Sequence, residues 1–231
     1  MIIDKNIKTA RFIRRPNRFQ AYVELEGEEL MVHVPNTGRC KEILIPGTEV
    51  ILREELNPSR KTLYDLIAAY KGDKLINIDS QIPNKVVEEA LKNGRVKELS
   101  NYTDIKREKT FGNSRFDFKL MDEVSHTEYF LEVKGVTLEE FGITKFPDAP
   151  TERGTKHLLE LIEVKKTGKG AGVLFLIQME NAKAFKPNDK MDKLFADSLT
   201  LAKSKGVDIM AYDCLLGENF ITLNNKIEIL L

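Results

Sequence analysis

The feature that most constrains the fold is a pair of adjacent segments, residues 114–122 and 127–135, in which apolar and polar residues alternate. Centring the turn between Val124 and Ser125 makes antiparallel pairing bring apolar residues together at three successive positions. These pairs are Phe116–Val133, Phe118–Leu131 and Leu120–Tyr129. A core-facing side of a sheet needs such apolar pairs, so the sequence predicts a β-hairpin in this register.

The same register gathers charged residues on the other face of the hairpin. Asp117 falls opposite Glu132, and Lys134 lies on that face one step further along. Directly opposed Cβ atoms lie about 4.5–5.5 Å apart, where two like charges are destabilising. A divalent cation with oxygen ligands resolves this conflict. We therefore expect Asp117 and Glu132 to bind Mg²⁺ or Mn²⁺.

These three residues also suit a reaction. A bound divalent ion lowers the pKa of a water molecule and neutralises charge on a phosphodiester. A neighbouring lysine orients or deprotonates the water, or stabilises the developing charge. Asp117, Glu132 and Lys134 are thus candidate catalytic residues for metal-assisted phosphodiester hydrolysis. The alternative is an ordinary solvated face on which Asp117 forms a surface salt bridge with Lys134 or Arg115.

The chain before the hairpin is rich in short strands. Five alternating segments punctuated by Gly and Asn precede residue 80, which favours a small OB-like β-barrel over residues 1–80. An open sheet is the alternative. The five segments are residues 8–27, 29–38, 47–56, 61–72 and 74–80.

Residues 81–231 have a different pattern of apolar and polar residues, in which helical and strand-like segments alternate. The patterns predict a helix, three strands, a helix, a buried strand, a helix and a strand, with Thr151 capping the second helix. The apolar run at residues 171–178 is typical of a central buried strand. The predicted class is α/β (α+β) with two domains, the second built on a mixed sheet.

That order of elements resembles the PD-(D/E)xK nuclease core, a helix–three strands–helix–strand framework. Asp117 and the tripeptide Glu132-Val133-Lys134 match the motif positions of that group. Some members of that group have a further acid on the first helix, for which Glu88 or Glu89 is a candidate here, although on an amphipathic helix such a residue is more often solvated.

The chain as a whole resembles the sugar fermentation stimulation protein A family. The segments that carry the resemblance are "VPNTGRC", "IPNKVVEEAL", "RFDF", "EVKGVTL", "FPDAPTERGTKHLLEL" and "AYDC". The resemblance implies an N-terminal OB-like domain, a C-terminal PD-(D/E)xK-type domain, DNA binding and a link to the regulation of sugar use. It implies DNA binding more firmly than cleavage.

Two basic segments are candidate DNA contacts. A basic strand with interleaved aromatic residues suits phosphate contacts and base stacking, and a helix N-terminus can receive a phosphate. The candidates are Lys8, Arg11, Arg14, Arg15 and Arg18 on the strand, and Arg153, Lys156 and His157 on the helix. The alternatives are a solubilising edge strand and a solvated first helical turn. Asp148 is either a further metal ligand or a turn residue.

The composition of the chain limits the kinds of binding partner that we expect. Lys plus Arg and Asp plus Glu both number 36, so the net charge is zero and only local charge can favour a polyanion. Two cysteines far apart in sequence favour a reducing, cytoplasmic location. No signal-peptide pattern and no apolar run of about 18 residues is present, so we expect no membrane partner. The oligomeric state is not predicted.

Three hypotheses follow. The first is a sequence-tolerant DNA-binding protein with a divalent-metal-dependent nuclease site. The second is a non-catalytic DNA-binding regulator of sugar metabolism on a nuclease-like scaffold. The third is an RNA or small-substrate phosphodiesterase with the same chemistry.

Overall fold

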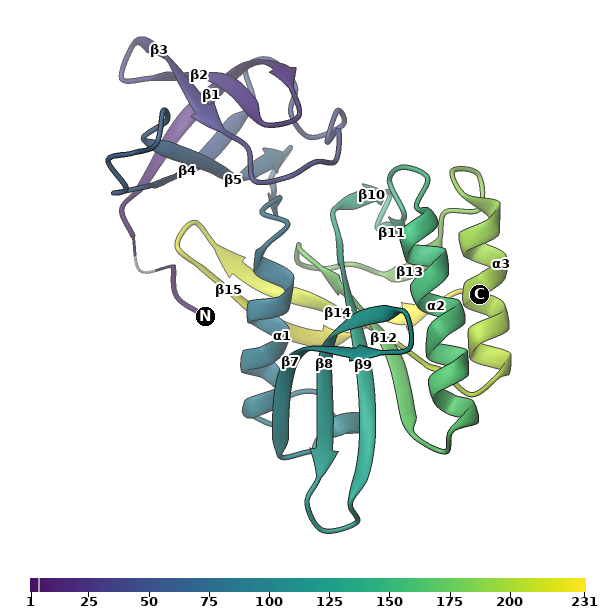
Figure 1. The fold of residues 1–231 in the computed structure, drawn as a ribbon. Helices are drawn as coiled ribbons and strands as arrows, with labels where there is room; N and C mark the ends of the chain where they lie inside the picture. Colours follow the sequence, from purple (N-terminus) through teal and green to yellow (C-terminus); the bar gives the residue numbers. More distant parts are fainter. Residues whose placement is uncertain (4) are drawn as a thin grey trace.

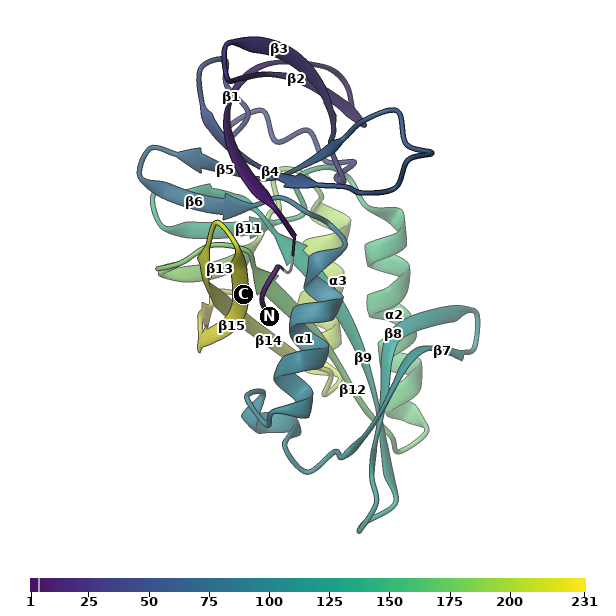
Figure 2. The same cartoon turned by 90° about the vertical axis from the view of Figure 1, so that its left-hand side faces the viewer.

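Six strands near the N-terminus form the first sheet of the computed structural model, which describes residues 1–3 and 5–231. The sheet order is β3-β2-β1-β4-β5-β6, and a further pairing of β3 with β5 closes it into a ring (Figure 2). The strands are β1 (Ile7–Asn17), β2 (Gln20–Leu25), β3 (Glu28–His33), β4 (Glu49–Glu54), β5 (Tyr64–Lys71) and β6 (Lys74–Asn77). The predicted small OB-like domain is confirmed.

The first alternating segment contains two strands, because the chain turns back between Asn17 and Gln20. Phe12 before the turn is 3% exposed and Phe19 within it is 48% exposed. Only Phe12 therefore belongs to the core.

The second large sheet has the order β15-β14-β12-β9-β8-β7. It is covered by α1 on one face and by α2 and α3 on the other (Figure 1). The strands are β7 (Asp104–Phe111), β8 (Ser114–Asp122), β9 (Thr127–Val136), β12 (Gly170–Ile177), β14 (Asp208–Gly217) and β15 (Phe220–Lys226). The helices are α1 (Ile82–Lys92), α2 (Glu152–Lys166) and α3 (Lys193–Ser204), with a short 3₁₀ turn, η1 (Lys97–Leu99).

The predicted order is confirmed for α1, β7, β8, β9, α2, β12, α3 and β14, whereas the last strand of this sheet, β15, was not predicted. Strand β12 is parallel to both β9 and β14, and β8 is antiparallel to β9, so the sheet is mixed. Thr151 caps α2 as predicted, since its hydroxyl accepts a hydrogen bond from the N–H of Gly154 at 3.0 Å.

A small third sheet was not predicted. It has the order β10-β11-β13-β16, with β10 (Leu138–Glu140), β11 (Ile143–Phe146), β13 (Ala184–Pro187) and β16 (Glu228–Ile229). Strands of two to four residues are too short to show a period, so sequence alternation could not reveal them.

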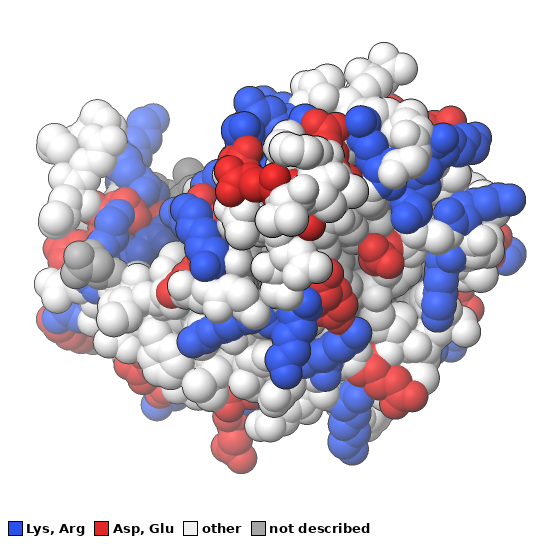
Figure 3. Space-filling model, turned by 90° about the horizontal axis from the view of Figure 1, so that it is seen from below, with Lys and Arg blue, Asp and Glu red and all other residues white. Residues whose placement is uncertain are grey.

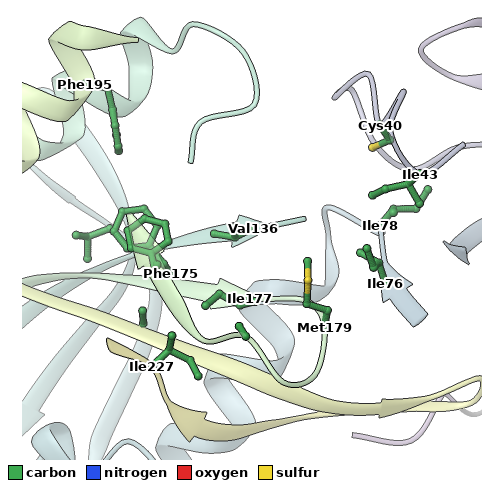
Figure 4. Close-up of a cluster of buried hydrophobic side chains, with 14 of the residues drawn as sticks. Cys40, Ile43, Ile76, Ile78, Val136, Phe175, Ile177, Met179, Phe195 and Ile227 are labelled. Atoms are coloured by element: carbon green, nitrogen blue, oxygen red, sulfur yellow. The ribbon is translucent and has the colours of Figure 1, made fainter. Parts of the chain in front are cut away.

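The two large sheets share one hydrophobic core (Figure 4). Cys40, Ile43 and Ile78 of the N-terminal part belong to the same buried cluster as Ile177 and Met179 of the C-terminal part. An isolated β-bridge joins Ile76 to Met179, and the N–H of Asn77 donates to the carbonyl of Gln178 at 2.9 Å. Apolar packing and backbone pairing therefore hold the two parts in one arrangement.

Charged side chains reinforce this junction. The guanidinium of Arg53 donates to Asp65 at 2.8 Å, to Glu55 at 2.9 Å and to Asp79 at 3.0 Å. Asp79 lies three residues before the start of α1, so one arginine connects the ring of strands to the segment that leads into the first helix of the second domain. Within the described chain, no helix has the length and apolar character needed to cross a membrane.

We predict that both domains unfold together. Ile78→Ala removes a fully buried side chain from the shared core and should lower the free energy of unfolding by about 2–5 kcal/mol. Urea unfolding followed by circular dichroism and by domain-resolved hydrogen exchange should show one transition, shifted as a whole. The control is Leu56→Ala at a residue that is 79% exposed. Two separate transitions, with only the first domain affected, would contradict the shared core.

Candidate active site

The paired strands β8 and β9 separate at Asp117. Their ladder runs from Asp122–Thr127 to Phe118–Leu131, which confirms the predicted hairpin register there. At the next position the Oδ2 atom of Asp117 accepts a hydrogen bond from the backbone N–H of Val133 at 2.8 Å. A side chain thus takes the place of a strand partner, and the two strands part to form the site.

This separation changes the face on which Phe116 lies. Its ring centroid is 5.8 Å from that of Phe130 and 5.9 Å from that of His157, on the α2 side of the sheet. Phe118 and Val133 pack in the cluster on the α1 side. The prediction that Phe116 faces Val133 in that cluster is wrong, because the regular side-chain alternation of β8 is broken at Asp117.

Glu132 is the most deeply buried acid of the site, at 4% exposure. Its Oε1 atom accepts hydrogen bonds from Nζ of Lys134 and from Nδ1 of His157, each at 2.5 Å. Its Oε2 atom is also buried but has no hydrogen-bond partner among the described residues. An unpartnered buried oxygen of this kind costs about 1–3 kcal/mol, which a bound cation would offset.

The hydrogen bonds of His157 define its tautomer. Nε of Arg153 lies 3.4 Å from Nε2 of His157, and a guanidinium can only donate. Nε2 therefore accepts, and the proton on Nδ1 is donated to Glu132. His157 was predicted to contact nucleic acid, but the structure buries it behind Glu132, where it orients the carboxylate.

The two acids differ in their electrostatic environments. Burial and then the charge of Glu132 raise the pKa of Asp117 above its usual value. Burial also raises the pKa of Glu132, but the hydrogen bond from His157 and the charge of Lys134 outweigh it, so the net pKa is lowered. Glu132 is thus a stable carboxylate, whereas the charged form of Asp117 is disfavoured until a cation is present.

The site residues fit a hard divalent cation. Over residues 1–3 and 5–231, no group of three or more His, Cys, Asp and Glu side chains is arranged to hold a metal ion. Two carboxylates are nevertheless enough for an ion that keeps several waters, as Mg²⁺ does. The unpartnered Oε2 of Glu132 and the raised pKa of Asp117 both indicate a place where positive charge is favoured.

Helix α1 contributes Asn84 rather than a third acid. The Nδ2 atom of Asn84 donates to Oδ1 of Asp117 at 2.7 Å. Glu88 binds Lys92 and Arg107, and Glu89 binds the amino terminus, so neither acid faces the site. Sequence reasoning missed the role of Asn84; its only signal was a polar residue in the first turn of α1, directly after Pro83.

The residue after Lys134 must be small. A Cβ atom on Gly135 would lie 2.4 Å from Oε1 of Gln178 and 2.8 Å from Cγ of Pro83. Gln178 is itself held by three hydrogen bonds from its Nε2 atom to Asn77 and Asp79. The end of β9 is therefore clamped between α1 and the residue that follows β12.

Most of the predicted basic residues of the N-terminal domain already have partners. Arg14 pairs with Glu29 at 2.9 Å and lies 4.0 Å from the ring centroid of Tyr22. Lys8 pairs with Glu26 at 3.0 Å. Arg11 lies between Glu24 and Glu49 on the neighbouring strands.

Arg15 has a different environment. Its guanidinium donates to the backbone carbonyls of Arg18, Asn36, Gly38 and Arg39, at 2.6–2.9 Å. The side chain thus holds the loop of residues 35–38 in place. This contact is set by tertiary structure and has no signal in the sequence pattern.

A second set of cations lines an open cavity of about 450 Å³ on the first domain. Arg18, Arg39 and Lys41 line it, and we call it the basic cavity. Arg18 lies 5.2 Å from the ring centroid of the exposed Phe19. Arg39 and Lys41 were missed because they stand singly in a loop, outside any periodic segment.

The basic residues of α2 lie near the acids. Arg153, Lys156 and His157 line a cavity of about 560 Å³ together with Asn113 and Arg115. Nζ of Lys156 donates to the carbonyl of Asn113 at 3.0 Å. The structure thus brings the predicted α2 residues to the site, while the predicted β1 residues lie apart on the first domain.

Charge elsewhere is mixed. In Figure 3 the molecule is seen from below, and Lys and Arg side chains alternate there with Asp and Glu. Asp148 lies against the loop at Gly38, where its Oδ2 atom would be 2.7 Å from an added Cβ.

The described elements form an OB domain joined to a mixed-sheet domain, in which two acids and a lysine lie where β8 and β9 part. Apart from the small-sheet strands β10 and β11, the order α1, β7, β8, β9, α2, β12 is the nuclease-like order expected from the sequence. The sequence matches the family model of the sugar fermentation stimulation protein RE domain over residues 81–220. It also matches the model of the SfsA N-terminal OB domain over residues 13–78. The chain belongs to the sugar fermentation stimulation protein family.

Relatives of the chain match it over 98–100% of its length. A sugar fermentation stimulation protein homolog of Clostridium tetani is 69% identical over 231 residues, which is all of both chains. The homolog of Clostridium novyi is 65% identical over 226 residues, or 98% of each chain. The solved structure of Pyrococcus furiosus SfsA in complex with Ca²⁺ is 29% identical, covers both chains completely and superposes with a TM-score of 0.89.

We predict that Asp117→Asn stabilises the metal-free protein at neutral pH. The folded pKa of Asp117 is raised, so the wild type loses stability as the pH rises from the unfolded value of about 3.9 through the folded value. The variant avoids this loss, and Asn84 can turn its amide oxygen toward the new amide. The difference in melting temperature should shrink as the pH falls below about 4.

Added Ca²⁺ or Mn²⁺ should make the wild type more stable than Asp117→Asn. Metal at a hundredfold excess over Kd should stabilise the wild type by about 2.7 kcal/mol and the variant by much less. Asp197→Asn on the outer face of α3 is the charge-matched control. If neither ion changes the melting temperature of the wild type, the metal assignment is contradicted.

Proposed function

We propose that the protein is a divalent-metal-dependent nuclease that binds DNA without sequence preference. The observation that carries this proposal is the state of Glu132. One of its oxygens is held by His157 and Lys134, and the other is buried, unpartnered among the described residues and close to a second carboxylate. Buried carboxylate oxygens with a purely structural role normally have hydrogen-bond partners on both oxygens.

Each residue has a definite role in this proposal. Asp117 and Glu132 would hold Mg²⁺ or Mn²⁺, which would supply charge neutralisation at a phosphodiester and a more acidic water. Lys134 would orient the attacking water or stabilise the charge that develops on the phosphate. Asn84 and His157 are positioning residues, because each contacts one of the acids.

The metal assignment is supported by the Pyrococcus furiosus relative, which was solved in complex with Ca²⁺. Ca²⁺ and Mg²⁺ share a preference for carboxylate oxygens and differ in ligand number and rigidity. Mg²⁺ or Mn²⁺ is proposed as the working ion here because a small octahedral ion needs few protein ligands and retains its waters.

DNA is proposed as the substrate because cations flank the acids. Arg153 and Lys156 line the cavity beside His157 and are exposed, so they can contact phosphate oxygens. Phosphate contacts position a nucleic acid but carry no sequence information, which fits a sequence-tolerant enzyme.

The proposed location is the cytoplasm. Cys40 and Cys214 are both buried and unpaired. Burial raises the pKa of each thiol, to about 12 for Cys40, so both remain protonated and unreactive at neutral pH. Unpaired thiols fit a reducing compartment.

A cleavage assay with matched variants tests the function. Single-stranded DNA, duplex DNA and RNA are incubated with Mg²⁺, Mn²⁺ or EDTA. We expect metal-dependent cleavage of DNA that falls about 10²–10⁴-fold in Lys134→Ala and at least as far in Glu132→Gln. Glu128→Gln on the same strand and Lys119→Ala on β8 are the controls, since these two residues pair with each other away from the site.

Other outcomes favour the rival hypotheses. Intact substrates with DNA binding unchanged in all variants would identify a non-catalytic regulator on a nuclease-like scaffold. Cleavage confined to RNA or to small phosphodiesters would identify the third hypothesis. Cleavage that survives in Glu132→Gln would show that the acids of β8 and β9 are not the catalytic centre.

A further inference from the structure

We propose that a cavity between the two domains, beside the start of α1, binds a small organic phosphate. We call this space the α1 cavity. None of Asp117, Glu132 and Lys134 lines it. The inference therefore concerns a second site and does not rest on the proposed nuclease function.

The α1 cavity has the size of a small-molecule site. Its volume is about 670 Å³, and small-molecule pockets usually measure about 300–1,000 Å³. The start of α1 points toward the ring of strands, and the amino terminus of the chain lies beside this helix (Figure 2). Both domains line the cavity, since Arg60 and Lys61 come from the OB domain and Ile82 and Lys85 from α1.

The lining has an excess of positive charge. Among the described residues that line the cavity, five are Lys or Arg and two are acids. A concave surface with an excess of one charge attracts ligands of the opposite charge. The five cationic residues are Lys5, Arg53, Arg60, Lys61 and Lys85.

Three of these cations already bind the two acids of the lining. Arg53 and Arg60 both donate to the carboxylate of Asp65, and Nζ of Lys5 lies 2.6 Å from Oε2 of Glu55. These contacts fix the polar wall that the OB domain contributes, so they leave the remaining two cations to receive a ligand.

Lys61 and Lys85 are the two remaining cations. Neither forms an ion pair with any part of residues 1–3 and 5–231, and both are exposed. Lys61 belongs to the OB domain and Lys85 to α1, and both line the same cavity. An anion held by both would therefore be bound from the two domains at once. An ammonium group is a common partner of phosphate, which it binds as a point charge.

The buried acid of the lining does not oppose an anion. Asp65 is only 3% exposed. Burial raises its pKa, but hydrogen bonds from Arg60, His33 and Arg53 outweigh this effect and lower the pKa to about 2. Its negative charge is thus compensated by three donors from its own domain.

His33 adds a hydrogen-bonding group for the rest of the ligand. Its Nδ1 atom lies 2.8 Å from Oδ1 of Asp65, and a carboxylate can only accept, so Nδ1 donates. Nε2 then accepts in the neutral ring, and it has no partner among the described residues. His33 lines the cavity, so a hydroxyl group of the ligand can donate to Nε2.

Helix α1 contributes a favourable electrostatic field. Gln81 at its N-cap makes no side-chain hydrogen bond to the first turn. The amino-terminal end of a helix carries a partial positive charge and favours phosphate groups. Gln81 and Ile82 line the cavity, so this end of the helix acts in the same direction as Lys61 and Lys85.

The test is a titration followed by amide NMR in EDTA, with the ionic strength held constant by KCl. The ligands are inorganic phosphate and β-glycerophosphate, which adds hydroxyl groups to the phosphate. Both should shift the amide signals of residues 60–62 and 81–82, and β-glycerophosphate should bind more tightly because it can also reach His33.

Matched variants test the two lysines. Lys61→Ala with Lys85→Ala should weaken the binding of β-glycerophosphate about tenfold or more, because two charged contacts are lost. Lys203→Ala with Lys205→Ala removes the same charge from exposed residues at the end of α3 and should bind like the wild type. Melting temperatures show whether both variants are folded.

Three results would overturn the site. They are shifts confined to residues 153–156 of α2, unchanged affinity in the Lys61 and Lys85 variant, and β-glycerophosphate that binds no more tightly than inorganic phosphate. Oligo(dT) of about 16 nucleotides is the second arm of the test. If it shifts the same amides and displaces β-glycerophosphate at lower concentration, the cavity is a nucleic-acid contact and the small-molecule site is rejected. Because no metal ion is free in EDTA, these outcomes are independent of nuclease activity.

Discussion

The hydrogen bond from the N–H of Val133 to the carboxylate of Asp117 is the contact on which the site depends. It replaces a strand-to-strand bond with a side-chain bond, so the N–H of Val133 keeps a partner while the neighbouring strands β8 and β9 part. The parting moves Phe116 to the α2 face and leaves Glu132 beside His157. The candidate site thus forms between two neighbouring strands of a well-packed sheet.

Burial of charge is the second constraint. An isolated carboxylate as buried as Glu132 would become protonated, and two donors on one of its oxygens prevent this. Those donors come from β9 and α2, and the neighbouring acid is held by α1 and β9. Helices α1 and α2 therefore contribute one polar contact each and β9 contributes two, which explains why the residues are spread from position 84 to position 157.

Sequence patterns predicted the parts of the fold that depend on periodicity. The ladder from Phe118–Leu131 onward followed from alternation, and the cap at Thr151 followed from local chemistry. The register also placed Asp117, Glu132 and Lys134 near one another, although the ladder ends at Phe118–Leu131 and the predicted pairing of Asp117 with Glu132 does not form. These features are local, or depend on one pairing of adjacent strands, so the sequence carries enough information to specify them.

Contacts between distant segments escaped that reasoning. The binding of Arg15 to loop carbonyls, the burial of His157 and the shared core near Met179 each depend on how sheets and helices pack. The sequence alone does not distinguish a basic residue that binds a phosphate from one that binds a backbone carbonyl. The strands of the third sheet are also shorter than any period that alternation can reveal.

The close packing at Gly135 limits how this protein can change over generations. Every other amino acid carries a Cβ atom, which would meet Gln178 and Pro83 at distances that no relaxed structure tolerates. Displacing either neighbour would also shift Lys134 or the helix that presents Asn84. A side chain at position 135 therefore requires Gln178 or Pro83 to move. The steric demands of the candidate site thus extend one residue past Lys134, to Gly135.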